Sequence, residues 1–120
     1  MRALVIDDSR AMRRIIKSML MESGFEVTEA ENGQDGLARL AELGSVDLAL
    51  VDWNMPVMNG YEFVQAVRKD RLHDGMRLMM VTTETGAEEM TLALEAGADE
   101  YVMKPFTKDA IIEKIRMLGL

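Results

Sequence analysis

The chain has 120 residues, which suits one domain spanning residues 1–120, because domains of about 100–150 residues can close a single hydrophobic core. Apolar residues make up 48% and charged residues 29% of the sequence, a composition that favours neither a disordered chain nor a membrane protein. The formal net charge of -7 opposes binding to nucleic acid, whose phosphates are held mainly by clustered Lys and Arg side chains.

The sequence contains no cysteine, so it has no disulfide framework and no thiolate metal site, as is compatible with a reducing compartment. Met1 leads within a few residues into an apolar run, without the basic segment, apolar stretch and cleavage site of an export signal. We therefore expect a cytoplasmic protein that binds neither a membrane nor nucleic acid.

Five short segments have the composition of β-strands. In chain order they are Ala3–Ile6, Phe25–Ala30, Leu48–Val51, Leu78–Val81 and Tyr101–Met103. Four are uninterrupted apolar runs, as is typical of strands buried on both faces of a sheet. The second, Phe25–Ala30, alternates apolar with polar residues, and this predicts a half-exposed edge strand.

Segments with apolar residues at helical spacing follow each of these runs. The apolar stripes contain Met12, Ile15, Ile16, Met19 and Leu20; Leu37, Leu40 and Ala41; Phe63, Val64 and Val67; Met90, Ala93 and Leu94; and Ile111, Ile112, Ile115 and Leu118. Gly24, Gly44 and Gly97 stand where helices should end, Asn59-Gly60 marks a turn before the third helix, and Thr107 is the expected N-cap of the last.

The alternation of strands and helices predicts an α/β protein with a doubly wound parallel sheet and helices on both faces. Five strands suit the order 2-1-3-4-5 of flavodoxin-like folds. In such sheets ligands bind beyond the carboxyl ends of the strands, where the strand order reverses. The functional site is therefore expected between the ends of the first and third strands.

Reactive side chains follow four of the five predicted strands. Asp7 and Asp8 follow the first, Asp52 the third, Thr82 the fourth and Lys104 the fifth. Carboxylates gathered at one edge repel one another, by about 4 kcal/mol for a pair about 4 Å apart at an effective dielectric of about 20. A hard cation offsets this repulsion, and Mg²⁺, which keeps several waters and shares its shell with a phosphate, suits so few carboxylates.

A metal ion, the Lys104 ammonium and the Thr82 hydroxyl together form the set of groups that phosphoryl transfer requires. Asp52 is then the expected nucleophile, forming an aspartyl phosphate. The plain alternative is that the aspartates only terminate strands as turn-favouring residues and that Lys104 is a solvated charge. Four such residues at four strand ends in register favour the functional site over this alternative.

Four segments resemble the receiver domain of two-component response regulators, and the resemblance extends over the whole chain. They are Ile6–Ser9, the run Asp-Trp-Asn-Met-Pro-x-Met-x-Gly at Asp52–Gly60, Val81–Thr82, and Met103–Phe106. Within that family the chain is most similar to single-domain chemotaxis receivers of the CheY type, through Met12-Arg13-Arg14, Trp53, Asn54, Glu84 and Tyr101.

The resemblance implies a role for each matched site residue. Asp8 and Asp52 would bind Mg²⁺ together with the backbone carbonyl of Asn54, and Asp7 would act on the metal through water. Asp52 would accept the phosphoryl group, and Lys104 would contact the phosphoryl oxygens. These assignments follow from the family and not from spacing alone.

The resemblance also implies a switch. Thr82 would turn onto the phosphoryl oxygens, and Tyr101 would follow from an outward to an inward rotamer. Asn54 and Glu84 occupy positions that tune how fast the acyl phosphate hydrolyses in the family, although a solvated polar side chain is the plain alternative for both. A cis peptide at Lys104–Pro105 is implied as well.

The implied partners are proteins. A histidine kinase of the CheA type would donate the phosphoryl group, a downstream protein such as a flagellar switch component would read the result, and a phosphatase is a further candidate. The surface that binds the downstream protein would consist of the fourth helix, fifth strand and fifth helix, with Met90, Tyr101 and Lys114. Glu88 and Glu89 open that helix where chemotaxis receivers often carry basic residues, which favours a different target. The protein is expected to be a monomer.

A basic patch on the first helix consists of Arg10, Arg13, Arg14 and Lys17. We interpret it as the solvated face of that helix, with a docking surface for a kinase or phosphatase as the alternative.

Three functions from different classes remain open. The first is a phosphoacceptor switch that catalyses only its own phosphorylation and dephosphorylation. The second is a receiver of a non-chemotaxis phosphorelay, or one excised from a longer transcriptional regulator, although the chain ends at Leu120 without a linker. The third is a haloacid-dehalogenase-like phosphatase, whose motif needs a second Asp two residues after the nucleophile, where this chain has Asn54.

Overall fold

The computed structural model of the chain describes residues 1–83 and 86–120. Within this part of the chain, strands and α-helices alternate. In order they are β1 (Arg2–Ile6), α1 (Arg10–Glu22), β2 (Glu26–Ala30), α2 (Gly33–Leu43), β3 (Leu48–Val51), α3 (Gly60–Lys69), the short 3₁₀ helix η1 (Arg71–His73), β4 (Arg77–Thr82), α4 (Ala87–Ala96), β5 (Glu100–Met103) and α5 (Lys108–Met117).

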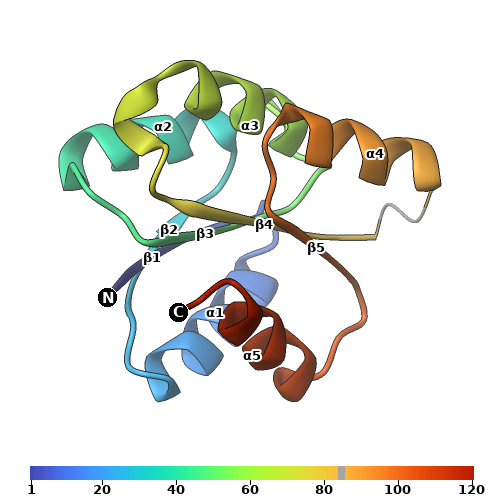
Figure 1. Ribbon diagram of the computed structural model, residues 1–120. Helices are drawn as coiled ribbons and strands as arrows, with labels where there is room; N and C mark the ends of the chain where they lie inside the picture. The colour runs from blue at the N-terminus through green and yellow to red at the C-terminus, as the bar shows by residue number, and fades with distance from the viewer. Residues whose placement is uncertain (84–85) are drawn as a thin grey trace.

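The strands form one parallel sheet in the order β2-β1-β3-β4-β5, which confirms the predicted doubly wound fold. Helices α2, α3 and α4 cover one face, and α1 and α5 cover the other (Figure 1). The strand order reverses between β1 and β3, which lie side by side with Ile6 opposite Val51. The carboxyl ends of these two strands therefore meet at the predicted place.

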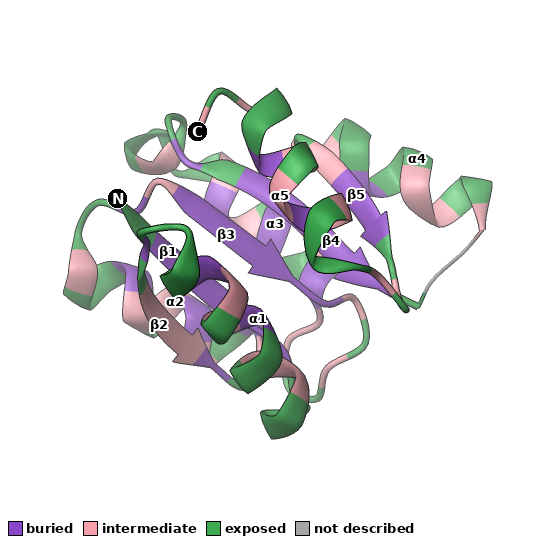
Figure 2. Cartoon of the chain, turned by 90° about the horizontal axis from the view of Figure 1, so that it is seen from below, coloured by how far each residue is buried: buried purple, intermediate pink, exposed green. Residues whose placement is uncertain are grey.

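The central strands are apolar because both of their faces pack against helices. Figure 2 shows β1, β3 and β4 as buried strands between helices with exposed outer faces. Phe63, Val64 and Val67 of α3 pack on one face, while Ile16 of α1 and Ile111 of α5 pack on the other. The two apolar layers hold the sheet rigid and leave its carboxyl edge for polar side chains.

The sequence pattern predicted the exposure of one edge strand correctly and that of the other in part. β2 is half exposed, as its alternating pattern predicted. The prediction that the fifth strand is buried on both faces is wrong for Met103, which is 44% exposed. β5 is the other edge of the sheet and pairs with β4 alone, so its last residue has no strand beside it on one side.

The predicted helix boundaries are confirmed. Asn59 caps α3: its side chain accepts from the backbone N–H of Glu62 at 2.8 Å, and its own N–H donates to the Glu62 carboxylate at 3.0 Å. Thr107 Oγ1 accepts from Ala110 N at 3.1 Å at the start of α5. Gly97 ends α4 with φ of 122°, a backbone conformation that glycine adopts without strain.

No helix among the described residues has both the length and the apolar character that crossing a membrane requires.

Gly60 begins α3 directly against the end of β3. A Cβ atom at this position would lie 2.0 Å from the backbone carbonyl oxygen of Asp52, so a side chain here forces the backbone apart. We expect Gly60→Ala to lower the free energy of unfolding in urea by about 1–3 kcal/mol, as overpacking does. Gly75→Ala is the control, because a Cβ at Gly75 meets no atom within 4 Å and should change stability by less than about 0.5 kcal/mol. Equal losses in both variants would contradict this packing.

Candidate functional site

The register of the sheet places four reactive side chains at one edge. Ile6 lies opposite Val51, so Asp7 and Asp52 follow neighbouring strand ends. Thr82 is the last residue of β4, and the backbone N–H of Lys104 donates to its carbonyl at 2.9 Å. The structure thus brings together side chains that are separated by up to 97 positions in the chain.

Three carboxylates form a compact cluster at this edge. Asp7, Asp8 and Asp52 each offer an oxygen atom, and these oxygens all lie within 4.8 Å of one another. Asp7 is only 2% and Asp52 only 9% exposed, whereas Asp8 is exposed. Two of the three charges are therefore largely removed from water.

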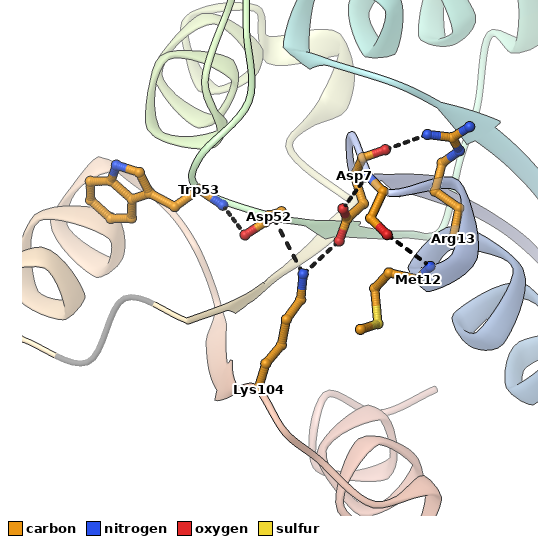
Figure 3. Close-up of polar contacts among 7 residues, drawn as sticks. Asp7, Met12, Arg13, Asp52, Trp53 and Lys104 are labelled. Atoms are coloured by element: carbon orange, nitrogen blue, oxygen red, sulfur yellow. Dashed lines mark hydrogen bonds and ion pairs between the residues drawn. The ribbon is translucent and has the colours of Figure 1, made fainter.

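Lys104 reaches into the cluster from the end of β5. Its Nζ lies 2.7 Å from Oδ2 of Asp7 and 3.3 Å from Oδ2 of Asp52, and its side chain is 12% exposed (Figure 3). One ammonium thus pairs with the two buried carboxylates, and the third carboxylate is exposed. The cluster retains an excess of negative charge.

The two buried carboxylates are held in place by backbone donors. The N–H of Ser9 donates to Oδ1 of Asp7 at 2.9 Å, and the N–H of Trp53 donates to Oδ1 of Asp52 at 2.8 Å. Ser9 also caps α1, because its Oγ accepts from the N–H of Met12 at 3.2 Å. Tight turns after β1 and β3 therefore orient both side chains.

Burial raises the pKa of Asp52 above that of an ordinary aspartate, because the ionised form loses its hydration. The charge of Lys104 lowers this pKa, and the charge of Asp7 raises it. Hydrogen bonds from the Thr82 side chain and the Trp53 backbone lower it further, but burial prevails. Ionisation of Asp52 in the metal-free protein therefore lowers the stability of the fold.

Burial lowers the pKa of Lys104, but the hydrogen bond to Asp7 and the charges of Asp52 and Asp7 more than offset this. The net result is a pKa above that of an ordinary lysine. Lys104 is therefore a permanent cation in the cluster.

The remaining predicted site residues lie around this cluster. Thr82 is fully buried beside Asp52. Tyr101 is 7% exposed and belongs to the apolar layer that contains Ala93 of α4. Asn54 is exposed, two residues after Asp52. Glu84 lies outside the residues that the structure describes.

The donor set fits a hard divalent cation. Three carboxylate oxygens within 4.8 Å, one of them exposed, leave coordination positions for water and a further ligand. Mg²⁺ binds carboxylates in this way, whereas a softer metal would need the nitrogen or sulfur ligands that the cluster lacks.

The prediction that the Arg13 side chain lies on the solvated face of α1 is wrong, and its contact with Asp7 was not expected from the sequence. The side chain is 14% exposed and donates to the backbone carbonyl of Asp7. Arg13 lies three and seven positions before Ile16 and Leu20, the buried residues of α1. That helical spacing was the signal, because residues so placed share one face.

Comparison with known proteins agrees with this geometry. Residues 3–116 match the response regulator receiver domain. A chemotaxis protein CheY homolog of Campylobacter jejuni is 45% identical over 116 residues, which are 96% of this chain and 89% of that protein. These matches confirm the resemblance that the strand-end motifs indicated.

Solved structures are similar over almost the whole chain. Vibrio cholerae chemotaxis protein CheY4 superposes with a TM-score of 0.90 at 33% identity, over 97% of this chain and 96% of that one. Response regulator protein TrrA of Thermotoga maritima, in complex with Mg²⁺ and BeF, superposes with a TM-score of 0.85 at 35% identity, over 98% of this chain and 97% of that one.

The Lys104–Pro105 peptide bond is cis, as the resemblance to receiver domains implied.

The raised pKa of Asp52 makes a testable statement about stability. A carboxyl group whose pKa is raised by folding destabilises the fold at pH values above that pKa and has no such effect below its unfolded pKa. We expect metal-free Asp52→Asn to unfold at higher urea concentration than the unaltered chain at neutral pH. This difference should shrink as the pH falls through the raised pKa of Asp52 and should be gone below about 4, the ordinary pKa of an aspartate.

Asp74→Asn removes one carboxylate from an exposed position and serves as the control, with an expected change below about 0.5 kcal/mol. A stabilisation by Asp52→Asn that did not depend on pH would contradict the assigned cause.

Proposed function

The chain belongs to the family of response regulator receiver domains, and from this premise we propose that residues 1–120 form a single receiver that Asp52 phosphorylation switches. The observation that carries the proposal is the acidic cluster of Asp7, Asp8 and Asp52 with Lys104 bound inside it. Domains of this type are signalling switches in two-component systems.

Transfer of the phosphoryl group is a substitution at phosphorus. A carboxylate oxygen of Asp52 attacks the phosphorus of a phosphohistidine on the kinase, and a new O–P bond forms as the P–N bond breaks. The imidazole leaves with the electron pair of that bond and takes up a proton. The product is an acyl phosphate on Asp52, so the domain catalyses only its own phosphorylation and its later hydrolysis.

Asp8, Asp52 and the backbone carbonyl of Asn54 would hold Mg²⁺, and Asp7 would bind it through water. Bound Mg²⁺ neutralises the charge on the oxygens of the transferring phosphoryl group. The excess negative charge of the cluster supports this assignment, as does the likeness to the Thermotoga protein solved with Mg²⁺ and BeF.

Lys104 and Thr82 supply the remaining interactions of the phosphorylated state. Lys104 already lies 3.3 Å from Asp52, and Thr82 is buried beside the same carboxylate, so both can donate to phosphoryl oxygens on it. Such charge-assisted hydrogen bonds contribute about 1.5–3 kcal/mol each. A population shift from 1:99 to 99:1 needs about 5.5 kcal/mol, so two of them supply much of what a switch requires.

The readout passes from Thr82 to Tyr101 on the neighbouring strand and out to the surface of α4, β5 and α5. Met90 and Lys114 of these helices are partly exposed, whereas Tyr101 of β5 is buried beneath them at 7% exposure. This surface would bind a downstream protein, for which a flagellar switch component is the candidate that the relatives suggest. The acidic start of α4 at Glu88 favours a target other than such a component. Asn54 and Glu84 tune the lifetime of the acyl phosphate.

The partners proposed for the chain follow from its relatives. The Campylobacter relative is a chemotaxis protein, which supports a chemotaxis role and a CheA-type histidine kinase as the phosphodonor. A phosphatase that resets the switch is a further partner. We propose that the domain works in the cytoplasm as a monomer.

Trp53 reports directly on the site, because its backbone N–H binds Asp52 and its ring stacks on Tyr61 with a centroid distance of 5.3 Å. We expect its fluorescence to change on titration with Mg²⁺ and to change again on addition of acetyl phosphate, a donor that needs no partner protein. Since the second change depends on the acyl phosphate, it should disappear in Asp52→Asn.

The Asp74→Asn variant should respond as the unaltered chain does. A second fluorescence change that persists in Asp52→Asn would refute Asp52 as the phosphoacceptor. No response to either addition would mean that the domain acts by binding alone.

A further inference from the structure

Arg13 lies beside the carboxyl end of β1, on the side of Asp7 that faces away from Lys104 (Figure 3). Its Nη1 donates to the backbone carbonyl oxygen of Asp7 at 2.6 Å, and its Nε donates to Oε1 of Glu29 on β2 at 3.1 Å. Lys17 Nζ lies 3.6 Å from the other oxygen of Glu29. The guanidinium therefore links α1, the end of β1 and the edge strand β2.

The Asp7 carbonyl lies where the hydrogen-bond ladder of the sheet ends. The register of β1 with β2 stops at Ile6 opposite Ala30, and the N–H of Asp7 still donates to the Ala30 carbonyl at 3.1 Å. The Asp7 carbonyl comes after that last ladder bond, and the guanidinium of Arg13 donates to it. A buried carbonyl needs such a partner, so loss of Arg13 would free this peptide to rotate.

The same peptide unit sets the direction of Asp8. The Asp7 carbonyl belongs to the rigid plane that joins Asp7 to Asp8, so a hydrogen bond to it also fixes where the Asp8 Cα lies. Among the described residues, the Asp8 carboxylate takes part in no hydrogen bond or ion pair. Its place within 4.8 Å of the other two carboxylates is thus set by the backbone.

We propose that Arg13 is a positioning residue for cation binding. Through the Asp7 carbonyl it orients the peptide that carries Asp8 into the acidic cluster, and Glu29 keeps the guanidinium in place. Arg13 itself touches neither the cation nor the phosphoryl group. The inference rests on the Mg²⁺ site of the proposed function and assigns a residue of α1 to it.

Charge and positioning predict opposite effects of removing Arg13. Its positive charge repels a divalent cation, so the loss of charge alone strengthens Mg²⁺ binding. Loss of a group that orients a ligand weakens metal binding by about tenfold or more. The sign of the change in affinity therefore separates the two roles.

The test is calorimetric titration of the whole chain with Mg²⁺ alone, comparing Arg13→Met with Arg14→Met. Arg14 is its neighbour on α1 and is exposed, and its side chain makes no hydrogen bond or ion pair with the described residues, so its substitution removes the same charge without the link. We expect the Kd for Mg²⁺ to rise about tenfold in Arg13→Met and to stay level or fall in Arg14→Met.

Thermal unfolding without Mg²⁺ shows whether each variant is folded. If Arg13→Met does not fold, Glu29→Gln tests the same link, because it weakens the anchor of the guanidinium and keeps a polar side chain. It should raise the Kd for Mg²⁺ by a smaller factor.

A Kd in Arg13→Met equal to or lower than that of Arg14→Met would overturn the positioning role, as would an unchanged Kd in Glu29→Gln. If the unaltered chain does not bind Mg²⁺, both this inference and the proposed function fail. Mg²⁺ binding that is no weaker in Arg13→Met than in Arg14→Met removes the inference alone.

Discussion

Burial of Asp7 and Asp52 beside Lys104 is the interaction on which the proposed function depends. Two carboxylates withdrawn from water and a third at the surface share one ammonium, so the site carries an excess of negative charge. The raised pKa of Asp52 expresses the cost of that arrangement. Such a cost is typical of functional sites, where groups are held ready for a ligand. In the function proposed here, a divalent cation would relieve this cost, and Lys104 would offer a fixed positive charge to a phosphoryl group on Asp52.

The apolar sheet makes this arrangement possible. Parallel strands end at the same edge, so residues at the carboxyl ends of β1, β3, β4 and β5 converge there. Helices on both faces keep the central strands fixed, and short hydrogen-bonded turns hold the polar side chains. Gly33 N, for example, donates to Met58 O at 2.9 Å and anchors the loop that follows Asp52. The acidic cluster is thus held in place both by the packed sheet and by hydrogen bonds in the segments that follow β1 and β3.

Much of the fold could be predicted because its signals are local. Uninterrupted apolar runs marked the buried strands, glycine and Asn59 marked helix ends, and the alternation of elements determined the strand order. The site followed from the fold, since Asp7, Asp52 and Lys104 each stand directly after a strand. Their grouping needed only the rule that parallel strands end together.

The rest depended on contacts between distant segments. The exposure of Met103 follows from the edge position of β5, which an apolar run does not reveal. In the sequence, Arg13 is one of several basic residues on α1. Only the folded structure shows that its guanidinium donates hydrogen bonds to the Asp7 carbonyl and the Glu29 carboxylate. The roles of Tyr101 in switching and of Asn54 in timing are properties of a phosphorylated state, so they stay predictions.

Phosphorylation of Asp52 is tested by the intact mass of the chain after incubation with acetyl phosphate. With Mg²⁺ present, we expect the unaltered chain to gain the mass of one phosphoryl group, and we expect this gain to be lost when the metal is chelated. The Asp52→Asn variant should gain nothing under either condition. A phosphoryl group on Asp52→Asn, or equal labelling with and without Mg²⁺, would contradict the assignment of Asp52 and its acidic neighbours as a metal-dependent phosphoacceptor site.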